Sequence, residues 1–239
     1  DLCRGLVNRG YQVSLLEPKG QQHGESTADI SIKPSEKDGY QLISIDNWVV
    51  RLTEAKYHVK FSPGSDLLKS VMKIYPSDIV HIQHTITMGT DIYRVAKEAG
   101  KIVIAAIHDF WLLCSRIQRV DDTWKLCDGP EDGTKCKECA KDHFQGSEED
   151  WQQRLSQHIY MLNRYVDVIT VVSNDLRNYF IKHGVDAGKL VIQHPSVSSV
   201  DDLWHNSQFT PRPFKPGTIR LAYVGTMLVV KGAHILLQA

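Results

Sequence analysis

The sequence predicts an α/β protein with a Rossmann-like parallel sheet, helices on both faces and a cysteine-rich loop insertion. Short, almost uninterrupted apolar segments, typical of buried strands, alternate with amphipathic segments typical of helices. The alternation stops between residues 112 and 146, where four cysteines are crowded, and then resumes. The composition, with 42% hydrophobic and 23% charged residues, is that of a globular domain with a sizeable core.

The first part of the chain predicts a less regular arrangement. Residues 1–10 indicate a helix that ends at Gly10, and residues 11–18 indicate a strand. The stretch from residue 19 to 39 is polar and predicts a loop. Two β-rich segments, 40–46 and 47–53, then alternate in hydropathy and indicate an antiparallel excursion or edge strands.

From residue 65 onward the alternation of helices and strands is regular. Helices are expected at 65–75, 90–100, 147–165 and 174–184, and strands at 78–84, 101–109, 167–173 and 189–195. The helix after Ser173 has clear end signals, because Ser173 can cap it, Asp175 lies in its first turn and Gly184 follows its last.

The alternation divides the chain into two domains. Residues 1–198 predict one domain whose first strand is missing, and residues 199–217, rich in Ser, Asp and Pro, predict a linker. Residues 218–239 predict the first strand and helix of a truncated second domain. Because a lone strand exposes its backbone groups, we expect this end to be disordered, to self-associate, or to pack on the first domain's edge.

The charge balance limits the classes of partner. Lys and Arg number 28, as do Asp and Glu, so no bulk positive field favours nucleic acid. The longest apolar run, 102–107, is far too short to span a bilayer, and no export signal opens the chain. We therefore expect a cytoplasmic protein; segments 40–50 and 56–60 leave open a peripheral contact at the inner face of the membrane.

Polar side chains at the strand ends are the first site candidates, because ligands of open parallel sheets bind beyond the carboxyl ends of the strands. These candidates are His81, His84, His108, Asp109, Ser173 and Asn174. His81 lies inside a strand, as a core histidine does. We expect His108 to be catalytic and His84, Asp109 and Ser173 to bind substrate; a purely structural role for His108 is the alternative.

The end of the chain offers a second half of a site. Gly225 follows an apolar segment, Lys231 supplies a point charge, and Gly232 precedes an expected helix whose first amides would face the same place. This arrangement suits a phosphate group. Taken alone the pattern is weak, since a Lys-Gly pair at a helix start is common and usually solvated.

Four of the five cysteines are crowded into the insertion. Cys114, Cys127, Cys136 and Cys139 have the spacing C-x12-C-x8-C-x2-C, which predicts a structural tetrahedral zinc site. His143 is a spare ligand if Cys114 is buried instead. Disulfides, an iron–sulfur cluster and free or redox-active thiols are the alternatives, the first disfavoured without an export signal. The loop is expected to form a wall or lid of the ligand site beside His108, or else to be a folding staple only.

Four segments together resemble glycosyltransferase family 4, which has the GT-B fold. They are residues 78–85, 102–114, 167–180 and 219–239, in that order. The resemblance implies an N-terminal acceptor domain, the start of a domain for the nucleotide-diphosphate sugar donor, transfer with retention, and no catalytic metal. It also implies that His108 lies beside the donor sugar and that Lys231 pairs with the donor diphosphate, where negative charge develops.

Two departures from the family pattern qualify this expectation. Thr226 stands where the family often has an arginine, and neither the family's first glycine-rich loop nor its paired glutamates occur in the sequence. We therefore expect a fragment, inactive by itself, of a retaining hexosyltransferase that acts on a saccharide or lipid-linked hydroxyl acceptor, as in polysaccharide biosynthesis. The alternative is a non-catalytic module whose zinc-stapled loop recognises a saccharide or protein partner.

Overall fold

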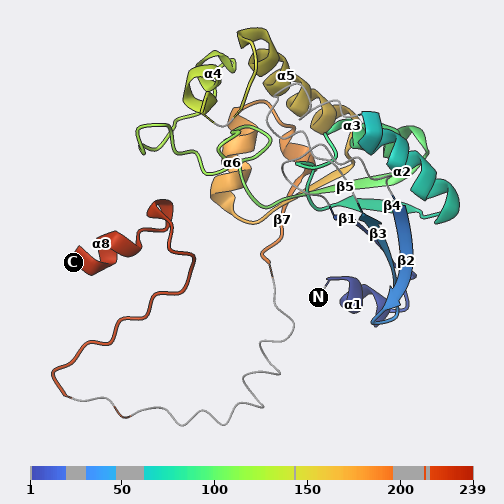
Figure 1. The fold of residues 1–239 in the computed structure, drawn as a ribbon, viewed down its shortest axis with the longest axis horizontal. Coiled ribbons are helices and arrows are strands. Elements are labelled where there is room, and N and C mark those ends of the chain that lie inside the picture. Colours follow the sequence, from blue (N-terminus) through green and yellow to red (C-terminus); the bar gives the residue numbers. More distant parts are fainter. Residues whose placement is uncertain are drawn as a thin grey trace. The chain divides into compact units, whose positions relative to one another are not determined.

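The computed structural model describes residues 2–19, 31–46, 62–142, 144–195, 213 and 216–238. The chain divides into two compact units, Asp1–Pro195 and Ser196–Ala239 (Figure 1). The division lies close to the end of the first predicted domain, at residue 198. Most of the predicted 199–217 linker lies outside the described residues, as does the predicted segment 47–53.

A small mixed sheet forms the first part of the larger unit. Helix α1 (Leu2–Val7) precedes β1 (Ser14–Lys19), β2 (Ser31–Lys37) and β3 (Tyr40–Asp46). The strand order is β1-β3-β2, with β1 parallel and β2 antiparallel to β3. The core side of this sheet comes from β3, whose Ile43 and Ile45 are buried.

Strand β2 corrects the prediction of a loop from residue 19 to 39. Its side chains are almost all exposed, so the apolar alternation that identifies a strand is absent from the sequence. Backbone pairing with β3 holds it instead. Asp38 and Gly39 join the two strands with φ of 49° and 78°, the positive values that a tight two-residue hairpin turn requires.

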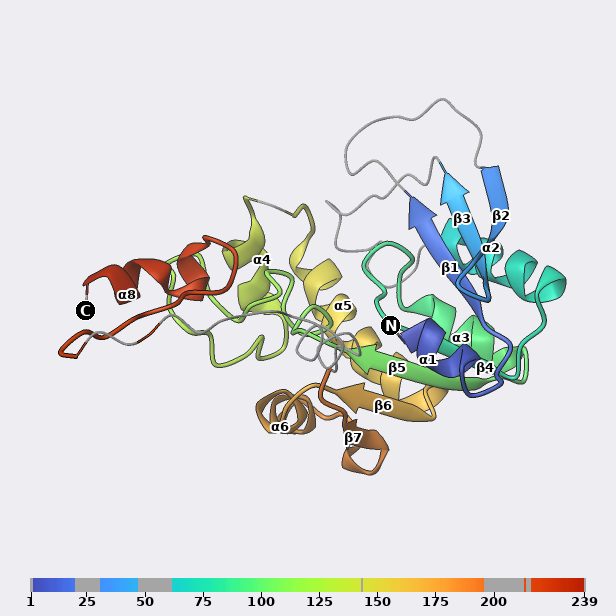
Figure 2. The same ribbon diagram turned by 90° about the horizontal axis from the view of Figure 1, so that it is seen from below.

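A four-stranded parallel sheet is the centre of the larger unit. Its strands are β4 (Ile79–Ile82), β5 (Ile102–Ile107), β6 (Val168–Val171) and β7 (Leu190–Ile192), and they lie side by side in sequence order (Figure 2). The helices around it are α2 (Ser62–Ile74), α3 (Asp91–Glu98), α5 (Glu148–Tyr165) and α6 (Asn174–Lys182), with a short 3₁₀ turn, η2 (Ala187–Lys189), before β7. These helices and strands confirm the regular alternation predicted from residue 65 onward.

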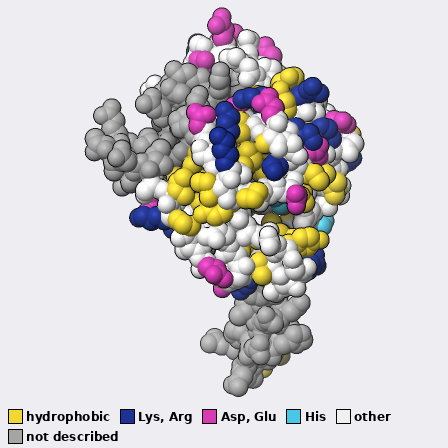
Figure 3. Space-filling view, turned by 90° about the vertical axis from the view of Figure 1, so that its right-hand side faces the viewer, with side chains coloured by type: hydrophobic (Ala, Val, Ile, Leu, Met, Phe, Trp, Pro, Cys, Tyr) yellow, Lys and Arg dark blue, Asp and Glu magenta, His cyan; other side chains and the backbone are white. Residues whose placement is uncertain are grey.

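Only one face of this sheet is fully buried in the described part of the chain. Val103, Ala105, Ile169 and Val171 on that face have no exposed surface. On the opposite face Ile79, Ile102 and Val191 are about half exposed. The prediction of helices on both faces stays a prediction, because residues 20–30 and 47–61 lie outside the described part of the chain. Figure 3 shows hydrophobic side chains grouped among charged ones on one side of the molecule.

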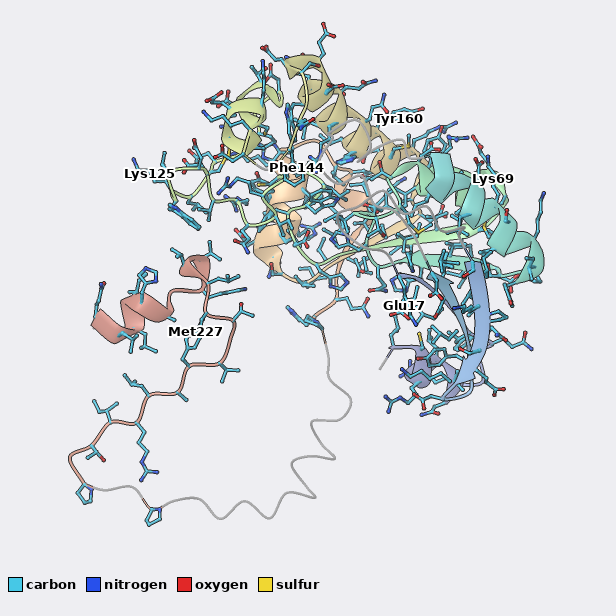
Figure 4. The ribbon with its side chains drawn as sticks, viewed as in Figure 1. Glu17, Lys69, Lys125, Phe144, Tyr160 and Met227 are labelled. Carbon is cyan, nitrogen blue, oxygen red and sulfur yellow. The ribbon has the colours of Figure 1, made fainter. Side chains whose placement is uncertain are left out.

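The cysteine-containing segment includes a helix that the sequence pattern did not indicate, α4 (Thr134–Ala140). Gly133 precedes it with φ of 101°, and a Cβ there would lie 2.7 Å from the carbonyl oxygen of Trp151. The ring of Phe144, labelled in Figure 4, has its centroid 6.1 Å from that of Trp111 and 6.3 Å from that of Trp151. Aromatic packing therefore fixes the end of this segment against α5.

The smaller unit contains η3 (Val229–Lys231) and α8 (Ala233–Gln238). The expected helix is present, but residues 218–224 form no strand. Ile219 and Val224 are 88% and 96% exposed. A strand needs a neighbour for its backbone groups, and these residues have none within the described part of this unit. No helix in the described residues has the length and apolar character needed to cross a membrane.

Candidate functional site

The carboxyl ends of β4 and β5 bring three of the predicted site residues together. His84 follows β4, and His108 and Asp109 follow β5 directly. The Nε2 atom of His84 lies 3.3 Å from the Oδ2 atom of Asp109. All three side chains are at least partly accessible to solvent. The edge of the sheet therefore carries two imidazoles and a carboxylate, groups suited to binding hydroxyls and moving protons.

Both ring nitrogens of His84 are already engaged. The backbone N–H of Ile86 donates to its Nδ1 at 3.0 Å, so the proton of the neutral ring lies on Nε2 and donates to Asp109. Asp109 also accepts the backbone N–H of Trp111, at 2.8 Å. Burial opposes ionisation of Asp109, but these hydrogen bonds outweigh it and lower its pKa below the ordinary value. His84 and Asp109 thus form a closed pair that shapes the turn after β5.

A second set of contacts joins His108 to His81 through Gln83. The Nε2 atom of His108 is 3.0 Å from the Oε1 atom of Gln83, and the Nε2 atom of Gln83 is 3.1 Å from the Nε2 atom of His81. Burial and the nearby His108 lower the pKa of His81. Sequence reasoning missed Gln83. Its position two residues after His81 was the available signal, because such side chains point to the same side of an extended chain.

Helix α5 holds the turn that follows Asp109. The guanidinium of Arg154, 3% exposed, donates to the carbonyl oxygens of Trp111 and Leu112, and the Nδ1 of His158 lies 2.7 Å from the Leu112 oxygen. Burial lowers the pKa of Arg154 to about 10. These residues were also missed from sequence. Their signal was a polar pair four positions apart on the apolar side of a helix.

Ser173 acts as the N-cap of α6. Its hydroxyl oxygen accepts the backbone N–H of Leu176 at 3.2 Å, as the end signals of this helix predict. Within the described part of the chain no hydrogen bond connects it to His84, His108 or Asp109. Its predicted part in substrate binding stays a prediction.

The three predicted phosphate-site residues all lie in the smaller unit. Gly225 has φ of 157°, and Gly232, with φ of 71°, ends η3 and precedes α8. The Lys231 side chain is exposed. The Tyr223 hydroxyl donates to the Thr226 carbonyl oxygen at 2.8 Å, a contact that spans Gly225. This geometry keeps the backbone of residues 223–226 compact, and the diphosphate contact of Lys231 stays a prediction.

The four insertion cysteines are free thiols that influence one another's ionisation. Burial raises the pKa of Cys136 to about 12, with Cys114, Cys139 and Cys127 adding to the shift. The Cys114 sulfur accepts backbone N–H groups, from Arg119 and Arg116, which oppose the rise that burial causes in its own pKa.

Their side chains do not form a metal centre as they stand. In the described ranges, no three His, Cys, Asp or Glu side chains are placed to hold a metal ion. The spare ligand His143 lies outside the described residues. Zinc at Cys114, Cys127, Cys136 and Cys139 therefore stays a prediction.

The parallel sheet with polar groups at its carboxyl edge defines a Rossmann-like α/β protein. A family model described as Glycosyltransferase Family 4 matches residues 1–199, most of the sequence. The chain therefore belongs to glycosyltransferase family 4, and the resemblance seen in the sequence is confirmed. No curated protein gave a significant match.

Two solved structures are similar to the chain at 9% sequence identity. One is an α,α-trehalose 6-phosphate synthase from Burkholderia multivorans, with a TM-score of 0.41 over 77% of this chain and 37% of that one. The other is an α,α-trehalose-phosphate synthase (UDP-forming) from Burkholderia xenovorans in complex with glucose-6-phosphate, with a TM-score of 0.38 over 70% and 35%. The chain thus spans little more than a third of the length of either protein.

Proposed function

We propose that this chain is part of a retaining hexosyltransferase that moves a sugar from a nucleotide-diphosphate sugar to a hydroxyl group of a saccharide or lipid-linked acceptor. Family membership over residues 1–199 is the observation that carries the proposal. The strand-end side chains add support, because an imidazole and a carboxylate at the carboxyl edge of a parallel sheet suit recognition of hydroxyl groups.

In this proposal the larger unit binds the acceptor and brings His108 to the sugar being transferred. His108 is exposed at the end of β5, the usual position of ligand contacts in such sheets. His84 accepts the Ile86 N–H after β4 and Asp109 accepts the Trp111 N–H after β5, so the pair fixes the backbone that follows both strands. They hold the site in shape, their own contact with the substrate stays a prediction, and His108 touches the substrate.

The smaller unit contributes to the donor half. Lys231 binds the diphosphate and stabilises the charge that develops on the departing nucleoside diphosphate. Gly225 and Gly232 leave room for the phosphates to approach the backbone. We expect this chain alone to have little or no turnover.

The test is isothermal titration of the full-length protein with a panel of nucleotide-diphosphate sugars. We expect one of them to bind, and Lys231→Ala to weaken it about tenfold, the loss of a charge-assisted contact. Lys137→Ala, which removes an exposed lysine of α4, is the matched control and leaves affinity unchanged. If the folded protein binds none of these donors, the proposal is contradicted.

A non-catalytic binding module is the second candidate, and one observation favours it. Thr226 stands in the place where the family often has an arginine. Its contact in the described residues is made by the backbone carbonyl oxygen, which accepts the Tyr223 hydroxyl. In that case the insertion, stapled by zinc, recognises a saccharide or protein partner. A folded protein that binds an oligosaccharide but no nucleotide sugar supports this candidate.

The cellular setting is part of the proposal. A cytoplasmic protein has access to nucleotide sugars, and a lipid-linked acceptor would bring it to the inner face of the membrane as a peripheral protein. Cell fractionation tests this: we expect the protein in the soluble fraction, or in the membrane fraction and released by high salt.

A further inference from the structure

The Gln83 side chain bridges two imidazoles at the carboxyl edge of the sheet, and its two ends are chemically different. Its Oε1 faces Nε2 of His108 at 3.0 Å, and its Nε2 faces Nε2 of His81 at 3.1 Å. An amide oxygen can only accept a hydrogen bond and an amide nitrogen can only donate one. The bridge therefore determines where both imidazoles carry their protons.

His81 is the accepting end. Its Nε2 receives the amide N–H of Gln83, so the proton of the neutral ring must lie on Nδ1, the tautomer that a free imidazole in water adopts less often. The neutral form is favoured, because burial and the neighbouring His108 lower the pKa of His81. Gln83 thus keeps His81 in an unusual state that an experiment can recognise.

His108 is the donating end. Its Nε2–H is used by the oxygen of Gln83, which leaves Nδ1 as a lone pair on an exposed ring. In the described ranges no other hydrogen bond reaches this ring. The Nδ1 of His84, by contrast, is occupied by the backbone N–H of Ile86. Of these two strand-end histidines, His108 alone has a ring nitrogen open to a ligand.

We propose that Gln83 is a positioning residue that holds His108 with Nε2 protonated and Nδ1 open, so that the site accepts a hydrogen bond from a hydroxyl group of the sugar substrate. The inference rests on the proposed function for the identity of that substrate. Asp109 is near enough for the charge of His108 to lower its pKa, and a carboxylate at that range favours a neutral hydroxyl over an anionic group such as phosphate. Gln83 itself does not touch the substrate.

The first test is ¹⁵N NMR of the histidine rings at pH 7.5, which reports the tautomer of each ring. We expect His81 as Nδ1–H and His108 as Nε2–H in the unmodified protein. Gln83→Leu should return His81 to the common Nε2–H form. Gln83→Glu should do the same to His81 while its carboxylate still accepts from His108. Gln153→Leu, an exposed glutamine on α5, is the matched control and changes neither ring.

The positioning role of Gln83 is overturned if His81 is the Nε2–H tautomer in the unmodified protein, or if Gln83→Leu leaves the tautomer of His81 unchanged. The second test is titration with the nucleotide-sugar panel, where Gln83→Leu should weaken binding about tenfold and Gln83→Glu should restore most of it. Equal affinity of all three proteins overturns the substrate part. If the unmodified protein binds no donor, the proposed function and that substrate part both fail, while the tautomers still decide the role of Gln83.

Discussion

His84 and Asp109, 25 residues apart in the sequence, meet across the ends of two neighbouring parallel strands, with 3.3 Å between Nε2 and Oδ2. The contact ties the second residue after β4 to the second residue after β5. Because Asp109 also accepts the Trp111 N–H, the direction of the chain after β5 depends on this carboxylate. The pair is thus a structural device next to His108, and its removal has measurable consequences.

Asp109→Asn should lower the free energy of unfolding by about 2 kcal/mol at pH 7, since hydrogen bonds to a charged group are lost or weakened. The pKa of Asp109 is lowered in the folded protein, so its stabilising effect is complete above the ordinary value of 3.8 and is lost as pH falls through the lower folded value. Urea unfolding at pH 7 and pH 3 checks this. The difference between the two proteins should shrink at low pH, whereas Asp142→Asn, at an exposed position, should change little at either pH.

The meeting of these strand ends could be predicted from sequence, because parallel strands in regular alternation share their carboxyl edge. The side chains that contact these strand ends could not be predicted from sequence. Gln83, Arg154 and His158 act through side-chain contacts that span 25 to 46 residues, and no local pattern encodes such distances. The sequence pattern thus identifies the edge of the sheet, and tertiary packing decides which groups remain open to a ligand.

The same distinction between local sequence pattern and tertiary packing applies to the secondary structure. Strands with a buried face were visible as apolar runs, but β2 has an exposed polar surface and exists through its pairing with β3. The order of the four parallel strands, β4-β5-β6-β7, is likewise a property of topology that hydropathy does not contain.

Arg154→Met should be strongly destabilising. The carbonyl oxygens of Trp111 and Leu112 lose buried donors, which should cost about 2–3 kcal/mol in chemical denaturation. Arg154→Lys should recover only part of this, because lysine lacks the planar fork that reaches two carbonyls. Arg164→Met, at an exposed position of the same helix, is the control. A loss as small as that of the control would mean that the turn does not depend on Arg154.

Protonation of His81 should make the fold less stable in mild acid. Its folded pKa lies below 6.5, so between that value and 6.5 the unfolded chain binds more protons and stability rises with pH. Above 6.5 this contribution is complete, and below the folded pKa it is lost. Thermal unfolding at pH 5 and pH 7.5 measures it. His81→Gln should show a smaller change between the two pH values than the unmodified protein, and an equal change would contradict the lowered pKa.

Variants of Ser173 test whether this helix N-cap residue also binds substrate. Ser173→Ala should lower the free energy of unfolding by about 1 kcal/mol, the usual cost of an N-cap, and Ser173→Asp should restore it. Donor affinity separates the two roles. If Ser173→Asp is as stable as the unmodified protein and binds the donor equally well, Ser173 is a cap alone; if it is stable and binds weakly, its predicted place in the substrate site is supported.

The last prediction concerns the four insertion cysteines, which we expect to bind about one zinc ion per chain. In the metal-free protein burial raises the pKa of Cys136 to about 12, so binding must release protons and affinity should fall as pH is lowered. Elemental analysis after gel filtration at pH 8 and pH 6 measures both effects.

Cys136→Ser with Cys139→Ser should abolish the metal and lower the melting temperature, whereas Cys3→Ser, in α1, should keep both. Iron with visible absorbance would indicate a cluster. No metal at either pH, with an unchanged melting temperature in the double variant, would mean that these thiols are free. In that case the contacts of Arg116 with Val120 and Cys139, and of Arg119 with Cys127, hold the segment without a metal.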